Sequence, residues 1–318
     1  MDKGEKVFVA GHEGMIGSAI LRRLQEDGFT KLITRTSAEL DLTDQKKVFD
    51  FFMDEKPDYV FLAAAKVGGI LANSSYPAEF IYDNIQIQNN VIHSAWKSGV
   101  KKLLFLGSSC IYPKGCPQPM KEEYLLSGKL EPTSEPYAVA KIAGIKMCQS
   151  YNLQYRTDYI AAVPADVYGP NDDFEPETGH VLPALIRKMH EAKIGNKHQV
   201  IVWGTGSPQR ECLYVDDLAD ACIFLIHNYD GSEMINVGSG EDLSIKELAL
   251  QIKEVVSFDG EVIFDESKPD GAPRKLLDSG RIRRMGWVPK TNLETGIIQT
   301  YQWYKNHVTT KMSSEICQ

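Results

Sequence analysis

Hydrophobic and polar positions follow two alternating patterns along the first half of the chain. Short apolar runs predict strands at Val7–Ala10, Lys31–Thr34, Tyr59–Leu62, Lys102–Leu106 and Tyr159–Val163. The segments between them have helical spacing and predict helices near Ile16–Glu26, Gln45–Glu55, Ala78–Ser98 and Tyr137–Tyr155. Runs such as VFLAAA and LLFLG are apolar throughout, which is typical of strands buried on both faces. The pattern therefore predicts an α/β fold built on a doubly wound (Rossmann) parallel sheet.

The pattern changes after Pro164, where VYGPNDDFEPETG concentrates turn-forming and charged residues. Shorter strand signals return at Val200–Trp203, Met234–Val237 and Val262–Phe264. We expect a Rossmann domain over residues 1–164, to which some later segments return. Residues 165–318 are then expected to form mainly a smaller, mixed α/β domain that holds the substrate.

Charge and composition narrow the class of protein. The 318 residues include 35 basic and 43 acidic side chains, a formal charge of −8, which argues against a nucleic-acid partner. No apolar run reaches the roughly 18–20 residues of a membrane helix, and the start MDKGEKVFVAGHEG does not resemble a secretory signal. We expect no membrane partner and a cytoplasmic location.

Cysteine usage agrees with a reducing compartment. The six cysteines form neither a CxxC pair nor a dense disulfide framework, and they give no metal-ligand spacing. They are Cys110, Cys116, Cys148, Cys212, Cys222 and Cys317. We expect free thiols and no metal.

A glycine-rich segment, Gly11-His-Glu-Gly14-Met-Ile-Gly17, directly follows the first predicted strand and opens the first predicted helix. Backbone amides and the positive helix end converge there, so the segment predicts a site for a dinucleotide pyrophosphate. The alternative is a turn with no binding role, but the strand before the segment and the helix after it favour coenzyme binding. Glu13 is a departure, because its carboxylate is expected to repel the coenzyme phosphates.

Arg35 bears on the choice of coenzyme. It lies at the end of the second predicted strand, where an NAD-selective enzyme usually offers an acidic side chain to the ribose hydroxyls. A guanidinium suits a ribose phosphate instead, so Arg35 favours NADP over NAD. The alternative is an ordinary solvated arginine.

Tyr137-Ala-Val-Ala-Lys141 places a phenol and an ammonium on one helix face. The lysine cation is expected to favour phenolate and bring the pKa of Tyr137 closer to neutrality, and it can also hold ribose hydroxyls. Ser108, Ser109 and Cys110 follow a predicted buried strand, where a hydroxyl can bond the carbonyl that Tyr137 protonates. Without that context, the spacing indicates only an amphipathic helix face.

These motifs together resemble the extended short-chain dehydrogenase/reductase family. Longer strings from about Lys6 to Tyr304 resemble GDP-L-fucose synthases, namely GHEGMIGSAI, AAAKVGGI, LGSSCIYP, EPTSEPYAVAKIAGIKMC and KPDGAPRKLLD. The resemblance implies an NADPH-dependent epimerase/reductase that converts GDP-4-keto-6-deoxy-D-mannose to GDP-L-fucose. The enzyme inverts C3 and C5 and then reduces the keto group at C4. The resemblance also implies a homodimer in which the two long helices of each subunit pair across a two-fold axis.

The resemblance assigns roles to particular residues. Ser108, Tyr137 and Lys141 form the reductase triad, and Cys110 and His180 exchange protons during epimerisation. This is chemically coherent, because carbons beside a carbonyl lose protons most easily and inversion needs removal on one face and return on the other. A lone cysteine or histidine is otherwise more often a small hydrophobe or a surface residue.

Binding residues follow in the same way. The contacts expected for NADPH are Gly11, Gly14, Met15, Ile16, Gly17, Arg35, Leu106, Gly107, Lys141, Pro164, Val167 and His180. The contacts expected for the GDP-sugar are Lys188, Trp203, Arg210 and Asp270. Lys188 stands where relatives often have arginine, which exchanges a bidentate fork for a point charge. The bland interpretations are a solvated helix face for Lys188, core for Trp203 and a turn for Asp270.

Two other functions stay open at this stage. One is a nucleotide-sugar 4-epimerase with tightly held NAD, against which Cys110, His180 and Arg35 argue, because simple hydride removal and return needs none of them. The other is a non-catalytic, NADP-binding regulatory protein. The intact set of Ser108, Tyr137 and Lys141 argues against it.

Overall fold

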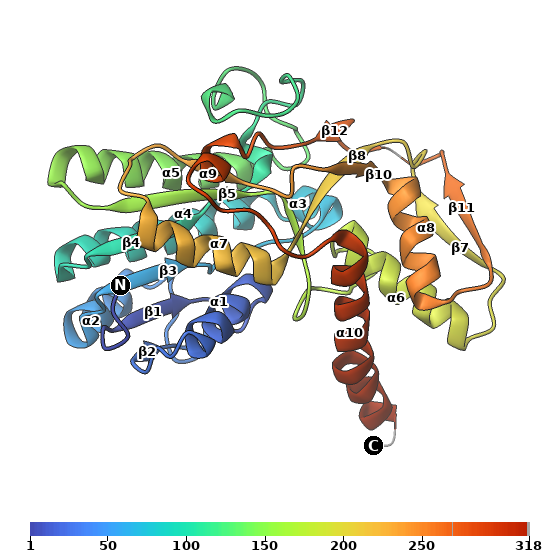
Figure 1. Cartoon of the computed structure of the whole chain (residues 1–318), viewed down its shortest axis with the longest axis horizontal. Helices are drawn as coiled ribbons and strands as arrows, with labels where there is room; N and C mark the ends of the chain where they lie inside the picture. Colours follow the sequence, from blue (N-terminus) through green and yellow to red (C-terminus); the bar gives the residue numbers. More distant parts are fainter. Residues whose placement is uncertain (269, 317–318) are drawn as a thin grey trace.

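A six-stranded parallel sheet forms the centre of the computed structural model, which describes residues 1–268 and 270–316 (Figure 1). Its strands are β1 (Val7–Ala10), β2 (Leu32–Ile33), β3 (Tyr59–Leu62), β4 (Lys102–Leu106), β5 (Tyr159–Pro164) and β9 (Ile235–Val237). They lie in the order β2-β1-β3-β4-β5-β9, and neighbouring strands pair in parallel. The predicted fold class is confirmed. The order reverses between β1 and β3, and open α/β sheets bind ligands outside the carboxyl ends of strands at such a point.

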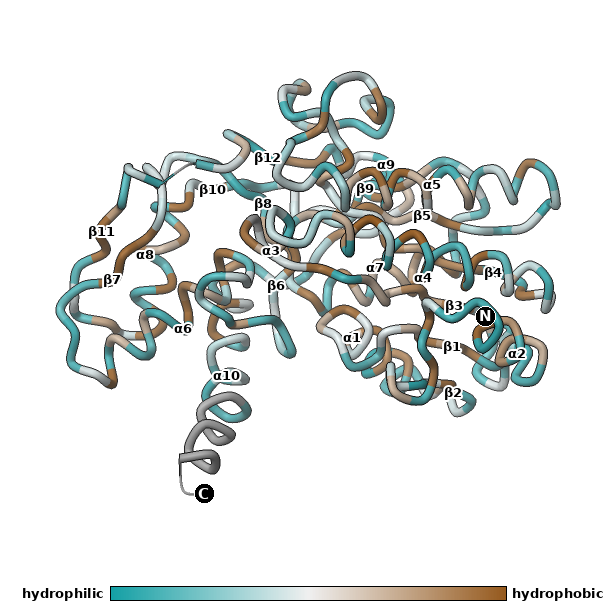
Figure 2. Tube along the Cα trace, turned by 180° about the vertical axis from the view of Figure 1, so that it is seen from behind, coloured by the Kyte–Doolittle hydropathy of each residue, from teal (hydrophilic) through white to brown (hydrophobic). Residues whose placement is uncertain are grey.

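Helices cover both faces of this sheet (Figure 1). On one side α1 (Met15–Glu26) packs against α7 (Val215–Asn228); on the other α4 (Pro77–Ser98) packs against both α2 (Gln45–Glu55) and α5 (Glu135–Tyr155). The residues of β1, β4 and β5 are buried throughout, and Figure 2 shows the most hydrophobic colours along the central strands. Coverage of both faces explains why these strands are continuously apolar.

The remaining strands form two small sheets. In one, β8 (Gln209–Tyr214) pairs with β6 (Asp166–Tyr168), β10 (Asp242–Ser244) and β12 (Arg274–Lys275); in the other, β7 (Gln199–Trp203) pairs with β11 (Glu261–Asp265). Strands at β7, β9 and β11 were expected from the sequence, whereas β6, β8, β10 and β12 were not. The helices of this region are α6 (Val181–Ile194), α8 (Ile245–Val256) and α10 (Leu293–Ile316). Four shorter helices complete the fold: α3 (Ile70–Ser75), α9 (Gly280–Arg284) and the 3₁₀ turns η1 (Ser109–Ile111) and η2 (Glu122–Tyr124).

Two separate hydrophobic cores hold these parts. The larger lies around the six-stranded sheet and includes residues of α7, β9 and α9. The smaller is formed by α6, α8, α10 and the strands beside them, with Ile186, Met189, Leu248 and Tyr304 among its most buried side chains. We propose that these cores correspond to the expected division at residues 1–164 and 165–318, and that α7, β9 and α9 are the segments returning to the first.

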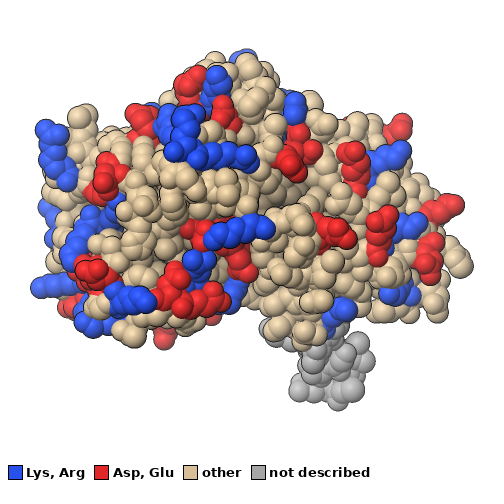
Figure 3. Space-filling model, in the orientation of Figure 1, with Lys and Arg blue, Asp and Glu red and all other residues tan. Residues whose placement is uncertain are grey.

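The surface carries charges of both signs. On the face shown in Figure 3, lysine and arginine side chains are interspersed with aspartate and glutamate. None of the helices within residues 1–268 and 270–316 is both long and apolar enough to cross a membrane.

Candidate active site

The glycine-rich loop between β1 and α1 is shaped by close backbone contacts. Gly11 has a φ of +84°, and a Cβ added there would lie 2.7 Å from backbone atoms of Ala64. A Cβ at Gly17 would lie 2.0 Å from the carbonyl oxygen of Gly11. The loop therefore depends on glycine at both positions, because α1 begins directly against the end of β1.

The first turn of α1 is open to a bound anion. Gly14 occupies the N-cap position, no side chain caps the helix, and its first turn contains no acidic residue. Gly14 is exposed, and Met15 and Ile16, which follow it, are half-buried. Free amides and the helix dipole suit a pyrophosphate, so these residues fit a dinucleotide coenzyme. Glu13, also exposed, stands beside this opening.

Arg35 is held on the surface of the first domain rather than free in solvent. Its guanidinium donates to Glu55 Oε1 at 2.5 Å and to the carbonyl of Thr34 at 2.8 Å, and it lies 5.4 Å from the ring centroid of Phe51. Arg35 is thus a partly exposed surface arginine whose guanidinium is engaged by Glu55. Its role towards a ribose phosphate stays a prediction, since the phosphate has to compete with Glu55.

Ser108 and Cys110 lie where β4 ends. The amide of Gly107 donates to the carbonyl of Ala162 at 2.7 Å, which holds the end of β4 against β5. Ser108 then caps η1, with its Oγ accepting from the amide of Cys110 at 3.4 Å. Burial raises the pKa of the Cys110 thiol, while the nearby Lys275, Ser108 and Lys141 act to lower it.

Lys141 reaches the same edge of the sheet from α5. Its side chain is 3% exposed, and Nζ donates to the carbonyl of Leu106 at 2.8 Å. The ammonium lies 5.6 Å from the ring centroid of Tyr137 and 4.9 Å from that of Phe105. Burial lowers the pKa of Lys141 to about 8, so the cation still predominates at neutral pH.

Tyr137 behaves differently from the expectation that Lys141 shifts its pKa downward. Burial raises the pKa of this phenol well above its usual value, and the charge on Cys110 acts in the same direction. Its ring meets Phe80 edge to face at a centroid distance of 6.3 Å. Tyr137 therefore keeps its proton at neutral pH and is suited to donate it.

His180 is brought towards this edge by the segment before α6. The amide of Gly69, in the loop after β3, donates to the carbonyl of Thr178 at 2.7 Å. Asn171 Nδ2 also donates to Ser18 Oγ of α1 at 2.9 Å. His180 itself is exposed at the N-cap position of α6 and makes no capping hydrogen bond. Its imidazole is thus available to a ligand.

Two charged residues that sequence reasoning missed lie within the site. Asp166, next to the predicted Pro164 and Val167, places Oδ1 3.9 Å from Lys275 Nζ and Oδ2 3.8 Å from Arg210 Nε. Burial acts to raise the pKa of Asp166, but Lys275, Arg210 and His180 bring it below the usual value. The signal for Lys275 was present in the string KPDGAPRKLLD, which contains it.

The predicted substrate residues fall into two groups. Trp203, at the end of β7, is 49% exposed and lies 6.0 Å from Lys188 Nζ and 5.4 Å from Lys268 Nζ, measured from its ring centroid. Asp270 accepts from both the amide and the hydroxyl of Thr205, two residues beyond Trp203. The core interpretation of Trp203 is therefore wrong.

Arg210 belongs with Asp166 rather than with Trp203. Its side chain is largely buried, and one guanidinium nitrogen donates to the carbonyls of Ala272 and Gln209 at 2.6 and 2.7 Å. Within residues 1–268 and 270–316, no group of three or more His, Cys, Asp or Glu side chains is arranged to hold a metal ion.

Comparison with known proteins decides the family. The model of the NAD dependent epimerase/dehydratase family matches residues 7–238. The chain belongs to this family. Within the NAD dependent epimerase/dehydratase family, it is 61% identical over 307 residues to GDP-L-fucose synthase 1 of Arabidopsis thaliana, covering 96% of this chain and 95% of that relative. The predicted resemblance to GDP-L-fucose synthases is confirmed.

Solved structures of the family have the same fold. A GDP-6-OMe-4-keto-L-xylo-heptose reductase from C. jejuni matches with a TM-score of 0.93 and 41% identity, over 96% of this chain and 99% of that one. A GDP-L-fucose synthetase from Naegleria fowleri bound to NADP matches with a TM-score of 0.90 and 28% identity, over 98% and 97%.

Proposed function

We propose that the protein is an NADPH-dependent epimerase/reductase that converts GDP-4-keto-6-deoxy-D-mannose to GDP-L-fucose. One observation carries the proposal: a proton-donating phenol, a buried ammonium, a serine hydroxyl and a thiol meet at the carboxyl end of β4. These groups are Tyr137, Lys141, Ser108 and Cys110. The relative from Arabidopsis thaliana is named a GDP-L-fucose synthase, and the structure from Naegleria fowleri is that of a GDP-L-fucose synthetase bound to NADP.

Reduction of the keto group needs a proton donor and a fixed orientation. When bound, NADPH supplies the hydride for the carbonyl carbon. Tyr137 gives its phenolic proton to the carbonyl oxygen, which its raised pKa permits because the proton stays on the phenol until it is needed. Lys141 stabilises the phenolate that remains on Tyr137. Ser108 donates a hydrogen bond to the carbonyl oxygen of the sugar.

Inversion at C3 and C5 uses a different pair of groups. Cys110 removes a proton from a carbon beside the keto group, and His180 supplies a proton to the opposite face. The electron pair left on carbon is delocalised onto the carbonyl oxygen, where Ser108 and Tyr137 stabilise the negative charge as hydrogen-bond donors. The same two donors thus serve both reactions.

The coenzyme and the GDP part of the substrate are assigned to different sides of the carboxyl end of β4. The Gly11–Gly17 loop holds the coenzyme pyrophosphate, with Leu106, Gly107, Pro164 and Val167 beside the reacting end. Trp203 offers an exposed ring to the guanine base, and Lys188 and Arg210 offer positive charge to the diphosphate. Asp270 offers an acceptor to the nucleotide or the sugar.

The two reactions can be tested separately by measuring deuterium uptake from heavy water and NADPH oxidation. We expect Cys110→Ser and His180→Gln each to slow deuterium uptake by about 100-fold or more, because each removes one proton-transfer group. Cys148→Ser, at a buried thiol on α5 away from the β4 edge, is the matched control and keeps the parental rate. Parental uptake in both variants would contradict the epimerase roles. NADPH oxidation without any uptake in the parental enzyme would instead indicate a reductase alone.

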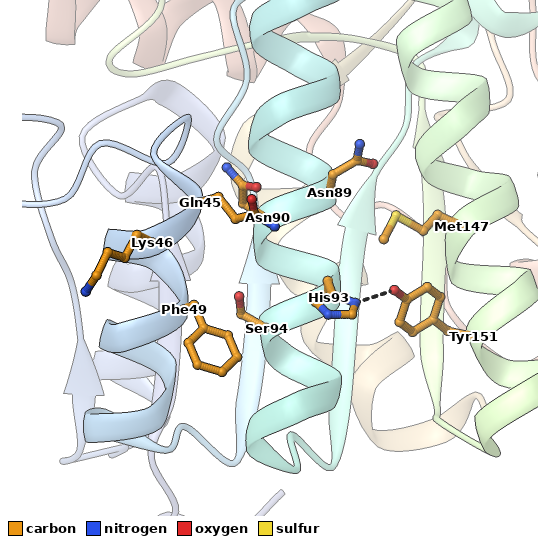
Figure 4. A pocket seen from close by; sticks show the side chains of 9 residues that line it. All are labelled: Gln45, Lys46, Phe49, Asn89, Asn90, His93, Ser94, Met147 and Tyr151. Atoms are coloured by element: carbon orange, nitrogen blue, oxygen red, sulfur yellow. Dashed lines mark hydrogen bonds between the residues drawn. The ribbon is translucent and has the colours of Figure 1, made fainter.

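The outer surface of α4 and α5 supports a homodimer. Tyr82 of α4 and Leu153 of α5 are 62% and 78% exposed. A depression also lies between α2, α4 and α5, where His93 and Tyr151 share a hydrogen bond of 2.7 Å (Figure 4). Large exposed apolar side chains on two adjacent long helices favour a four-helix interface around a two-fold axis.

Molecular mass in solution tests the dimer. We expect the parental chain to sediment as a dimer and Leu153→Glu to sediment as a monomer, since a buried carboxylate at the interface is costly. Ile194→Glu changes another exposed apolar residue, on α6, and leaves the dimer intact. A monomeric parental chain would contradict the assignment.

A cytosolic location fits the chemistry of the thiol. Cys110, Cys116, Cys148, Cys212 and Cys222 are unpaired, and the epimerase role of Cys110 requires that it stay so. Rapid alkylation of cell extracts before purification, followed by mass spectrometry, is expected to find all five in the reduced form.

A further inference from the structure

The segment AAAKVGGI forms the loop after β3 and contains the pair Gly68-Gly69. Gly69 is the N-cap residue of α3, and its φ of −68° is open to any L-amino acid. The backbone conformation therefore does not require glycine there. The surroundings do, because a Cβ added at Gly69 would lie 2.8 Å from the carbonyl oxygen of Thr178 and 2.9 Å from that of Gly179.

This close approach joins the first domain to the chain directly before His180. The amide of Gly69 donates to the carbonyl of Thr178 at 2.7 Å, so the two backbones touch with no side chain between them. Thr178 and Gly179 lead straight into His180, the N-cap residue of α6, which makes no capping hydrogen bond. A shift of the Thr178–Gly179 backbone is therefore passed to the imidazole through the chain itself.

The loop after β3 is held firmly on its own side of this contact. Asn73 Nδ2 donates to the carbonyls of Gly68 and Gly69 at 2.7 and 3.0 Å, and Asn84 bonds both the amide and the carbonyl of Lys66 at 3.0 and 2.9 Å. Both asparagines are buried. Because these buried hydrogen bonds would have to break before the loop gave way, a side chain added at Gly69 displaces the opposite backbone instead.

The segment before His180 is a loop tied to the first domain at a second point. The amide of Gly179 donates to the carbonyl of Glu175 at 3.0 Å, and Asn171 Nδ2 donates to Ser18 Oγ of α1 at 2.9 Å. Asn171 and Glu175 are exposed, so this loop can shift into solvent more readily than the loop after β3. Its contacts with Gly69 and Ser18 therefore fix where His180 lies.

We propose that Gly69 is a positioning residue for His180 in the epimerisation step. The inference rests on the proposed function of His180. By leaving room for two carbonyl oxygens, Gly69 lets the segment before His180 seat against the first domain, which carries Tyr137 and Cys110. His180, as imidazolium, then returns a proton to the enolate: an N–H bond breaks, a C–H bond forms from the enolate electron pair, and the keto group is restored.

The test compares Gly69→Ala with Gly115→Ala by deuterium uptake from heavy water in the full chain. In Gly69→Ala the two carbonyl oxygens have to retreat by about half an ångström to reach ordinary contact distance, and we expect uptake to fall by about 10- to 100-fold. Gly115 lies in the loop after η1, where an added Cβ has no atom of the described residues within 4 Å. Gly115→Ala is thus the matched control and keeps the parental rate.

The same substitution in the His180→Gln background separates positioning from a general structural role. A residue that acts only through His180 loses its effect once the imidazole is gone. We therefore expect Gly69→Ala to change the residual uptake of His180→Gln by less than about twofold. A substitution that merely disturbs the fold slows both backgrounds by the same factor. Equal losses in the two backgrounds, or parental uptake in Gly69→Ala, would overturn the inference.

Asn171→Gly tests the second tie without adding an atom, and it serves if Gly69→Ala fails to fold. Asn171 has a φ of 65°, which glycine adopts freely, so the substitution removes the hydrogen bond to Ser18 without straining the backbone. We expect uptake to slow by about fivefold, and again no further loss in the His180→Gln background. Unchanged uptake in Asn171→Gly would show that the seat of this loop does not govern His180 and would overturn the inference.

A crystal structure of Gly69→Ala gives a readout that does not depend on activity. We expect the Cα atom of His180 to move by about half an ångström or more relative to Tyr137 and Lys141. An unmoved His180 would overturn the inference. Absence of deuterium uptake in the parental enzyme, or parental uptake in His180→Gln, would overturn the proposed function of His180 instead, and the displacement would still decide whether Gly69 positions this side chain.

Discussion

Lys141 and Lys275 are held in place by different parts of the fold. Lys141 of α5 bonds to the carbonyl of Leu106 of β4, 35 positions earlier, and both elements belong to the Rossmann half of the chain. Lys275 meets Asp166 across 109 positions of chain, through two short strands that pair with β8. The first arrangement is encoded by a local motif and a buried strand. The second exists only after the small sheet has assembled, so it is sensitive to parts of the chain that carry no motif.

The largest effect is expected at Tyr137, which supplies the proton and lies in the locally encoded Tyr137–Lys141 motif. Tyr137→Phe removes the phenolic proton and is expected to lower kcat for NADPH oxidation by about 10²- to 10⁴-fold. Tyr151→Phe, on the same helix but bonded to His93 at the outer surface, is the control and keeps kcat within about twofold. Equal rates in the two variants would remove Tyr137 from the mechanism.

Gly17 and Gly14 of the glycine-rich loop offer a matched pair of substitutions in the Rossmann half of the chain. A Cβ added at Gly17 would lie 2.0 Å from the carbonyl oxygen of Gly11, whereas a Cβ added at Gly14 would lie 3.5 Å from the same oxygen. We expect Gly17→Ala to lower the free energy of unfolding by about 3 kcal/mol and to abolish NADPH binding. Gly14→Ala is expected to change the stability of the coenzyme-free chain by less than about 1 kcal/mol. Denaturant unfolding of both variants checks this, and similar stabilities would contradict the close approach of α1 to β1.

The pH dependence of stability at Glu211 tests the small sheet around β8, which depends on long-range pairing. Glu211 is 1% exposed, and its carboxylate accepts from the amides of Leu277, after β12, and Gly240, before β10, which joins β8 to both segments. Burial raises the pKa of Glu211 from 4.5 to about 7. The stability that Glu211 contributes is therefore fully present below pH 4.5 and is lost as the pH rises to about 7, because the unfolded chain releases the proton first.

The measurement is the difference in free energy of unfolding between the parental chain and Glu211→Gln. We expect this difference to fall by up to about 3 kcal/mol as the pH rises through that window. Glu241→Gln, at an exposed position nearby, gives a difference that stays nearly constant. A flat profile for Glu211→Gln would show that the carboxyl is ionised throughout.

The smallest effect is expected at Arg35. Its contact with Glu55 of the next helix, α2, spans 20 positions of chain, fewer than either lysine contact compared above. Arg35→Ala is expected to reduce the preference for NADPH over NADH by about tenfold, equivalent to about 1.4 kcal/mol of phosphate contact. Glu55→Gln frees the guanidinium and keeps the preference. If Arg35→Ala leaves the ratio of the two kcat/KM values unchanged, Arg35 serves only as the partner of Glu55.

The same contrast explains what could be predicted from the sequence. The strands β1, β3 and β4 were placed correctly because full burial on both faces makes them continuously apolar. The glycine spacing and the Tyr137–Lys141 spacing are likewise local. In contrast, β12 is the dipeptide Arg-Lys and β10 is Asp-Leu-Ser, and neither carries a strand pattern. Their existence depends on pairing with β8, so the placement of Asp166 and Lys275 could not be predicted either.

Burial accounts for the one electrostatic expectation that was wrong. The Tyr137–Lys141 spacing indicated a lowered pKa for the phenol, as an exposed helix face would give. In the fold both groups are withdrawn from water, and desolvation raises the pKa of Tyr137 while lowering that of Lys141. The sign of such a shift depends on tertiary burial, which spacing along a helix does not report.

The most direct test of the account is a single reaction in heavy water with unlabelled NADPH and GDP-4-keto-6-deoxy-D-mannose, followed by identification of the sugar. The account predicts stoichiometric NADPH oxidation and GDP-L-fucose that carries deuterium on the two carbons flanking C4 and ordinary hydrogen on C4. A product without deuterium, or a substrate returned with NADPH unconsumed, would contradict it.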